Sequence, residues 1–165
     1  SIDVVFSMYT PPALTRRYQV RVLDGARYGA QPDAHEPNDH CRIATDIASP
    51  FSTTLSIDSP YDLDWFRFTV DQPSQVRIAV DCRSCRTDDV RSFADVYLYA
   101  DRRPRDGEFP NDLPLLRNVY TEGEPCEISQ DLEPGAYLIK FANSWTDALA
   151  EVDLEVSWSP VGGGD

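Results

Sequence analysis

Two short acidic stretches carry the side chains whose chemistry is easiest to name. The first contains Glu36, Asn38 and Asp39, and the second contains Asp62 and Asp64. Calcium takes about six to eight oxygen ligands from carboxylates, amide carbonyls, backbone and water. If the fold brings the stretches together, their charges repel each other unless a cation or protons intervene. The sequence therefore indicates a cation site, and the alternative is an acidic turn in solvent, capped by Asn and Asp side chains.

Catalytic motifs are absent from the sequence. The histidines, His35 and His40, flank the first acidic stretch, and no serine or cysteine lies in a nucleophile elbow. The chain has no HExxH motif, Walker loop or GxGxxG fingerprint. Pairs of carboxylates for glycoside cleavage are uninformative, because 28 acidic residues provide many of them. We interpret the chain as non-catalytic.

Four cysteines, Cys41, Cys82, Cys85 and Cys126, indicate the redox environment. An even number in an acidic, proline-rich chain favours two disulfides in an oxidising compartment and leaves their pairing open. A four-thiolate zinc site is the rival interpretation, but such sites usually combine two CxxC pairs. A redox-active CxxC motif is disfavoured, because no βαβ pattern surrounds it.

The net charge of the chain excludes some classes of binding partner. The net charge is −13, from 28 acidic and 15 basic side chains. A surface this negative repels nucleic-acid phosphates and anionic membranes. No window approaches the roughly 20 apolar residues of a membrane helix. We therefore expect no nucleic-acid partner and no membrane insertion. The cysteines favour a secreted, cell-surface or periplasmic location.

Apolar and polar residues alternate with a period of about two, as in strands that pack on one face. The turns between them are rich in proline, glycine and aspartate. This spacing predicts an all-β fold, an antiparallel β-sandwich of jelly-roll character. The predicted apolar faces are Phe66, Phe68 and Val70; Val76, Ile78 and Val80; Ala94, Val96, Leu98 and Ala100; Tyr137, Ile139 and Phe141; and Val152, Leu154, Val156 and Trp158.

The chain divides into three parts. Residues 1–35 form a β-rich N-terminal extension, interpreted as the closing hairpin of a preceding repeat or as strands added to this sandwich. Residues 36–160 form the sandwich, and 161–165 form a flexible tail. Within the sandwich we expect a hairpin closed by the turn at 71–74, a helical turn or two in 41–48, and a long surface loop at 102–113.

Four segments give the sequence its family resemblance: 36–39, 62–70, 94–101 and 132–139. In this order they resemble the bacterial pre-peptidase C-terminal domain. Its pattern runs from an EPND opening, through a D-x-D-W/Y-F-x-F strand and a D-x-Y-L-Y-D strand, to an L-x-P-G-x-Y hairpin. The resemblance covers about residues 36–158. It implies a non-catalytic β-sandwich attached to secreted bacterial proteins, often peptidases, and related to the collagen-binding domains of bacterial collagenases.

The resemblance also implies a calcium site. Relatives that bind calcium use the EPN opening and the acidic turn before the D-W-F strand. Collagenase relatives have a glutamate two positions before the EPN glutamate, where this chain has Ala34, so either the affinity is lower or Asp33 or Asp58 substitutes. The implied ligands are Glu36, Asn38 and Asp64, and the neighbouring Asp39 and Asp62 would add two more.

A binding surface would need aromatic side chains presented together. Trp65, Tyr97, Tyr99 and Leu138 share the side of their strands that faces away from the core, and Trp145 lies in the loop at 143–147. We expect Trp65 to be buried, and Trp145 either to bind a ligand or to anchor its loop.

If Tyr97 and Tyr99 are exposed and coplanar, they form a platform for an extended protein or a glycan. The partner is then an extracellular protein or polysaccharide polymer, or neighbouring domains of the parent protein. The alternative functions are a carbohydrate-binding module with structural calcium and a purely structural spacer or adhesin repeat.

Overall fold

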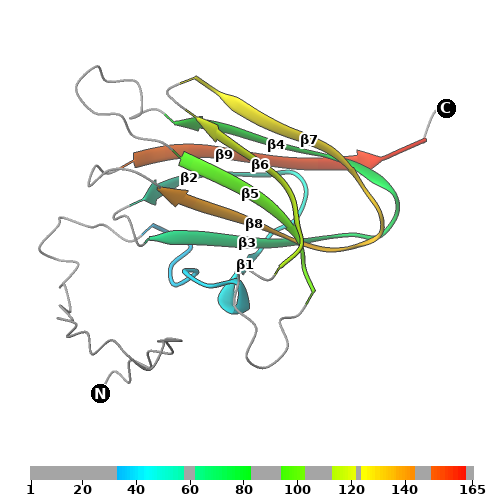
Figure 1. The fold of residues 1–165 in the computed structure, drawn as a ribbon, viewed down its shortest axis with the longest axis horizontal. Coiled ribbons are helices and arrows are strands. Elements are labelled where there is room, and N and C mark those ends of the chain that lie inside the picture. The colour runs from blue at the N-terminus through cyan, green and yellow to red at the C-terminus, as the bar shows by residue number, and fades with distance from the viewer. Residues whose placement is uncertain are drawn as a thin grey trace, which may run out of the picture.

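The computed structural model describes residues 33–57, 62–82, 94–102, 113–121, 124–143 and 150–162. In these residues the strands form two sheets that pack face to face (Figure 1). One sheet has the order β1-β3-β8-β5-β6 and the other β2-β9-β4-β7. Among the described residues the strand pairs are antiparallel, except that of the short β1 with β3. The predicted all-β sandwich is confirmed.

The strands have the following bounds: β1 Thr45–Asp46, β2 Phe51–Ile57, β3 Leu63–Val70, β4 Ser74–Cys82, β5 Ala94–Ala100, β6 Leu115–Thr121, β7 Cys126–Leu132, β8 Gly135–Asn143 and β9 Ala150–Pro160. A short 3-10 helix, η2, spans Cys41–Ile43, within the stretch where the sequence predicted a helical turn.

The core between the sheets consists of the apolar faces that the alternation predicted. Val76, Ile78 and Val80 of β4 are at most 2% exposed, and Leu154 of β9 is fully buried. On the opposite sheet, Phe66 is also fully buried. Each such side chain contributes about 1.5–3 kcal/mol when it leaves water. The core therefore supplies the main stabilisation of the sandwich.

The turn after β3 does not close the predicted hairpin. β3 pairs with β8, whereas β4 pairs with β7 and β9, so the chain crosses from one sheet to the other. The turn between β7 and β8 crosses in the same way, although the family pattern suggested a hairpin there. Alternation shows which face of a strand is apolar, but not which strand lies beside it. Two strands in opposite sheets that face each other across a core show the same alternation as two strands that are hydrogen-bonded in one sheet.

A second group of buried residues, here called the outer cluster, covers part of the outer face of the five-stranded sheet. The segment containing η2 lies against this face, beside β1 and β3 (Figure 1). Arg67 helps to hold it, because its Nη2 donates to the carbonyl of Cys41 at 2.9 Å. Trp65 is buried, as expected. The outer cluster consists of Cys41, Ala44, Trp65, Tyr99, Leu113 and Leu138.

The prediction of two disulfides is wrong, because Cys41 and Cys126 are both free. Cys41 lies in the outer cluster, and Cys126 begins β7 of the other sheet, so the two thiols occupy different layers. Two bridges would require all four cysteines. Cys82 is disulfide-bonded, and Cys85 lies outside the described residues.

The domain boundaries remain partly open. Residues 1–32 and 163–165, and most of the loop predicted at 102–113, lie outside the described residues. Asp33 and His35 contact β2, so the sandwich includes residues before the expected boundary at 36. Val161, in the predicted tail, donates its N–H to the carbonyl of Pro73 at 2.9 Å. Within the described residues, no helix is long and apolar enough to cross a membrane.

Candidate metal site

The segment 33–38 links two strands that belong to different sheets. The carboxylate of Asp33 accepts hydrogen bonds from the N–H of His35 at 2.7 Å and from that of Ser56, on β2, at 3.4 Å. The ring of His35 packs edge-on against Phe51 of β2 and Phe66 of β3, with centroid distances of 5.7 and 5.3 Å. These contacts hold the segment beside the start of β3.

Backbone hydrogen bonds then place the first acidic stretch. The N–H of Trp65 donates to the carbonyl of Asn38 at 3.1 Å. The N–H of Asn38 donates to Oε2 of Glu36, also at 3.1 Å. Asn38 is fully buried. The loop that carries Glu36 and Asn38 is therefore joined directly to β3 at the position next to Asp64.

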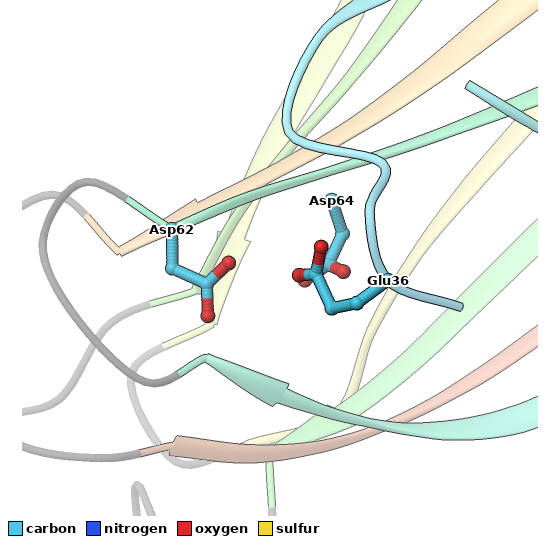
Figure 2. A group of neighbouring side chains, drawn as sticks. All are labelled: Glu36, Asp62 and Asp64. Atoms are coloured by element: carbon cyan, nitrogen blue, oxygen red, sulfur yellow. The ribbon is translucent and has the colours of Figure 1, made fainter. Parts of the chain in front are cut away.

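Three carboxyl groups meet at this point. Glu36, Asp62 and Asp64 each offer an oxygen, and these oxygens lie within 4.8 Å of one another. Figure 2 shows the carboxyl groups of Glu36 and Asp64 next to each other, with Asp62 turned toward them from the residues that precede β3. The predicted meeting of the two acidic stretches is therefore found in the structure. Such a group can hold a metal ion.

Several buried side-chain polar atoms beside the three carboxyl groups have no hydrogen-bond partner among the described residues. Asp64 is 1% exposed, yet neither of its carboxyl oxygens has a hydrogen-bond partner among the described residues. The same holds for Oδ1 and Nδ2 of Asn38. Burying a polar group without a partner costs about 1–3 kcal/mol, and more for a charged one. A cation bound by the three carboxyl groups and the Asn38 amide oxygen would supply a partner for each unpartnered oxygen, whereas Nδ2 of Asn38 is a donor and would still need an acceptor.

The pKa shifts of the carboxyl groups also indicate that the site needs a positive charge or protons. Burial raises the pKa of Asp64 to about 8, and the charges of Asp62 and Asp33 add to the shift, while the nearby Asn38 side chain opposes it. Burial also raises the pKa of Glu36, against a backbone hydrogen bond from Asn38 that lowers it. Both shifts disfavour the charged forms. At neutral pH the site therefore needs protons or a cation to offset its negative charge.

Not every predicted ligand lies in this group. Asp39 is exposed and is not one of the three gathered carboxylates, although its charge contributes to the raised pKa of Glu36. Asp33, considered as a substitute ligand, already accepts two backbone hydrogen bonds. Asp58, the other substitute, lies outside the described residues.

The aromatic residues singled out as a binding platform are only partly exposed. Tyr97 and Tyr99 stack with an interplanar angle of 20° and centroids 6.1 Å apart, so their rings are nearly parallel and do not lie side by side in one plane. Tyr99 is only 8% exposed, in the outer cluster, whereas Tyr97 is half-buried. Trp145 lies outside the described residues. The exposed platform is therefore not formed by this pair.

Sequence reasoning missed Lys140. Its Nζ lies 5.2 Å from the ring centroid of Tyr97 and 5.8 Å from that of Trp65. Lys140 is the only lysine of the chain, and it occupies an outward position of a strand pattern. That signal was present in the sequence, but its aromatic neighbours come from β3 and β5, and their order in the sheet was unknown.

Comparisons with known proteins establish the fold. No protein-family model and no curated protein matches the chain. The pre-peptidase C-terminal domain of a collagenase from Bacillus anthracis is similar in structure, with a TM-score of 0.50 and 15% sequence identity. The match covers 69% of this chain and 94% of that domain.

A second similar structure is CorA, a surface-associated copper-binding protein of Methylomicrobium album BG8. Its TM-score is also 0.50, its sequence identity is 9%, and the match covers 69% of this chain and 97% of CorA. At these identities the similarities concern the fold alone. The chain has the fold of a pre-peptidase C-terminal domain, which agrees with the resemblance of its motifs.

Proposed function

We propose that this chain is a non-catalytic accessory module of a larger exported bacterial protein, stabilised by a calcium ion. Glu36, Asp62 and Asp64 would hold the ion, together with the amide oxygen of Asn38. The observation that carries the proposal is the buried Asp64 carboxylate, which has two carboxylate neighbours and no hydrogen-bond partner among the described residues.

The donor set favours calcium over other metals. All the gathered ligands are oxygens, and hard oxygen donors suit calcium, magnesium and manganese rather than zinc or copper. Magnesium demands near-ideal octahedral geometry and usually keeps several waters, whereas calcium accepts irregular sets of carboxylates and carbonyls. Four protein oxygens from two short segments form an irregular set. Calcium therefore fits best.

The ion would act on stability rather than on chemistry. It would neutralise charges that burial disfavours, and it would tie the loop before η2 to the start of β3. Because the site exists only when these segments meet, the ion binds the folded chain and not the unfolded one. Such binding stabilises the fold in proportion to the logarithm of the free ion concentration.

A non-catalytic role agrees with the contacts of the two histidines. The ring of His35 lies between Phe51 and Phe66, with its Nε2 2.9 Å from Oγ1 of Thr53. Nδ1 of His40 accepts the N–H of Arg42 at 3.1 Å and so caps η2. Nδ1 of His40 also lies 3.6 Å from Sγ of Cys41. That thiol is 2% exposed and burial raises its pKa, which is the opposite of an activated nucleophile.

Thermal unfolding tests the calcium proposal. Millimolar calcium should raise the melting temperature of the chelator-treated protein by several degrees, because ligand binding stabilises only the folded state. Asp64→Asn and Glu36→Gln should each remove most of this response, and calorimetric titration should show the loss of calcium binding directly.

Asp39→Asn is the matched control. It removes a carboxylate from the same loop, but one that is exposed and outside the gathered group. Its calcium response should equal that of the unmodified chain. The proposal fails if calcium and chelator leave the melting temperature unchanged. It also fails if Asp64→Asn responds as strongly as the control.

Export is supported by Cys82, which is disulfide-bonded, because disulfides persist in oxidising compartments. With Cys41 and Cys126 free, its partner would be Cys85. Because Cys41 and Cys126 are free, denatured but unreduced protein should react with two equivalents of a thiol reagent. After reduction, all four cysteines should react. Four reactive thiols in protein purified from an oxidising compartment would contradict this pairing.

A further inference from the structure

The outer face of the five-stranded sheet continues beyond the outer cluster as a polar and aromatic surface. Strand register places Lys140, Tyr97 and Asn118 side by side in one row across β8, β5 and β6. The next row contains Ala142, Asp95 and Tyr120. Residues directly opposite each other in antiparallel strands point to the same face. We call this surface the shelf: Asp95, Tyr97, Asn118, Tyr120 and Lys140.

The shelf is exposed to solvent on β6 and half-buried on β5 and β8. Tyr120 is 61% exposed, and Asn118 is exposed as well. Asp95, Tyr97 and Lys140 are half-buried. The small side chain of Ala142 lies beside Asp95 and is itself 8% exposed.

Contacts within the sheet hold the half-buried side chains in place. The hydroxyl of Tyr97 donates to Oδ2 of Asp95 at 3.4 Å, and the Tyr97 ring stacks on that of Tyr99. The ammonium of Lys140 lies over the Tyr97 ring. A ligand that meets such side chains does not have to order them first, which lowers the cost of binding.

The functional groups of the shelf match those of a sugar chain. A carboxylate accepts hydrogen bonds, an ammonium donates them, and an amide does both. Sugar hydroxyls donate and accept, and the C–H face of a pyranose can cover an aromatic ring such as that of Tyr120. We infer that the shelf binds a neutral polysaccharide, with a sugar ring on Tyr120 and hydroxyls hydrogen-bonded to Asp95 and Asn118.

Two other polymers fit less well. An anionic polysaccharide would approach a chain with a net charge of −13 and is repelled. A proline-rich peptide offers carbonyl acceptors, but proline has no N–H to donate. A covering peptide would leave Asp95 with the Tyr97 hydroxyl as its donor while removing water from its remaining acceptor positions, and that loss is costly. A neutral polymer rich in hydroxyl groups satisfies both conditions.

This inference rests on the proposed accessory role, because it gives that role a ligand class, but it does not need the calcium ion. The test is affinity electrophoresis of the full chain in gels that contain hydroxyethylcellulose, galactomannan or starch, with pull-down on insoluble cellulose. Polygalacturonate and a collagen-like peptide serve as the anionic and proline-rich competitors. At least one neutral polysaccharide should retard the chain.

Tyr120→Ala should weaken that retardation about tenfold, because it removes an exposed aromatic contact surface. Tyr120→Phe should keep most of it, since the ring remains. Asp95→Asn should weaken it as well, while leaving the sandwich intact. Ile43→Ala is the control, because Ile43 is exposed to a similar extent, 51%, but lies on η2.

Absence of retardation by all the neutral polysaccharides would overturn the inference. So would equal retardation of Tyr120→Ala and the unmodified chain, or Tyr120-dependent binding of the collagen-like peptide alone. The calcium-dependent melting shift separates the two proposals. A normal shift without polysaccharide binding refutes only the shelf, whereas polysaccharide binding without a shift refutes only the calcium site.

Discussion

Asp64 and Phe66 are successive inward residues of β3, and they illustrate two kinds of buried site. Phe66 is fully buried among the rings of His35, Phe51 and Phe141. Asp64 is 1% exposed among carboxylates and has no hydrogen-bond partner among the described residues. Burial of Phe66 stabilises the fold in nearly any solution, whereas burial of Asp64 stabilises it only when a proton or a cation is supplied. One face of one strand therefore contains both a permanent core and a conditional site.

The largest expected effect is the pH dependence of the ion-free protein. The Asp64 pKa is raised from 3.8 to about 8, so the folded state holds a proton that the unfolded state has already lost. The stabilisation is complete below about pH 4 and disappears as the pH rises through about 8. Converted at about 1.4 kcal/mol for each pH unit, this corresponds to on the order of 5 kcal/mol.

Urea unfolding in chelator at about pH 5 and about pH 8.5 measures this difference. The unmodified chain should be markedly less stable at the higher pH. Asp64→Asn should show a much flatter profile, because it removes the titrating group. Saturating calcium should flatten the profile of the unmodified chain, since the ion takes the place of the proton. Equal stability of the ion-free chain at both values would show that Asp64 is not a conditional site.

A substitution in the permanent core should have a somewhat smaller effect. Leu154→Ala, on β9 of the opposite sheet, should cost about 2–5 kcal/mol, because Leu154 is fully buried and its truncation leaves a cavity. Calcium should raise the melting temperature of this variant by as much as that of the unmodified chain. A reduced calcium response would mean that the core and the site are coupled, and the contrast between them would have to be withdrawn.

Much of this contrast could be predicted from the sequence. The period that marks Phe66, Phe68 and Val70 as inward residues also places Asp64 on that face, where a carboxylate is unexpected. The family resemblance, through the EPN opening and the aspartate at the start of the D-W-F strand, implied the meeting of Glu36 and Asp64. What could not be predicted was the sheet to which each strand belongs, because alternation is a property of single strands, whereas pairing depends on contacts between distant segments.

The free thiols and the shelf were missed for the same reason. Cys41 and Cys126 lie on different sheets, and no local pattern reports that separation. Lys140 and Tyr120 lie on either side of β5, so their common surface exists only after β5 has been placed between β8 and β6. Asp39, in contrast, was predicted as a ligand from its place in the motif, but its side chain is exposed to solvent. The motif gives the order of residues and not the direction of each side chain.

A buried carboxylate that has a cationic partner provides a third test, with a smaller expected effect, of the contrast between the permanent core and the conditional site. Asp101 is nearly as buried as Asp64, with a side chain 10% exposed, but Nε of Arg67 lies 2.9 Å from its Oδ2. Arg67→Met should cost about 1–3 kcal/mol, because it removes the partner of a buried charge and the hydrogen bond to the carbonyl of Cys41. The loss should be the same with calcium and with chelator. Dependence on calcium would show that the η2 segment transmits strain to the metal site.

The smallest effect is expected on the outer face of the four-stranded sheet. Nε of Arg77 lies 2.8 Å from Oε2 of Glu127, and Nη1 lies 3.6 Å from Glu155, but Arg77 and Glu127 are 49% and 43% exposed. Exposed ion pairs contribute about 0–1 kcal/mol, and salt screens them. Arg77→Gln should therefore shift the unfolding free energy by less than about 1 kcal/mol, with a still smaller shift in about 0.5 M salt. A larger loss that salt does not reduce would mean that an exposed ion pair stabilises this fold as strongly as a buried one. Burial would then not explain why Asp64 differs from the exposed charges.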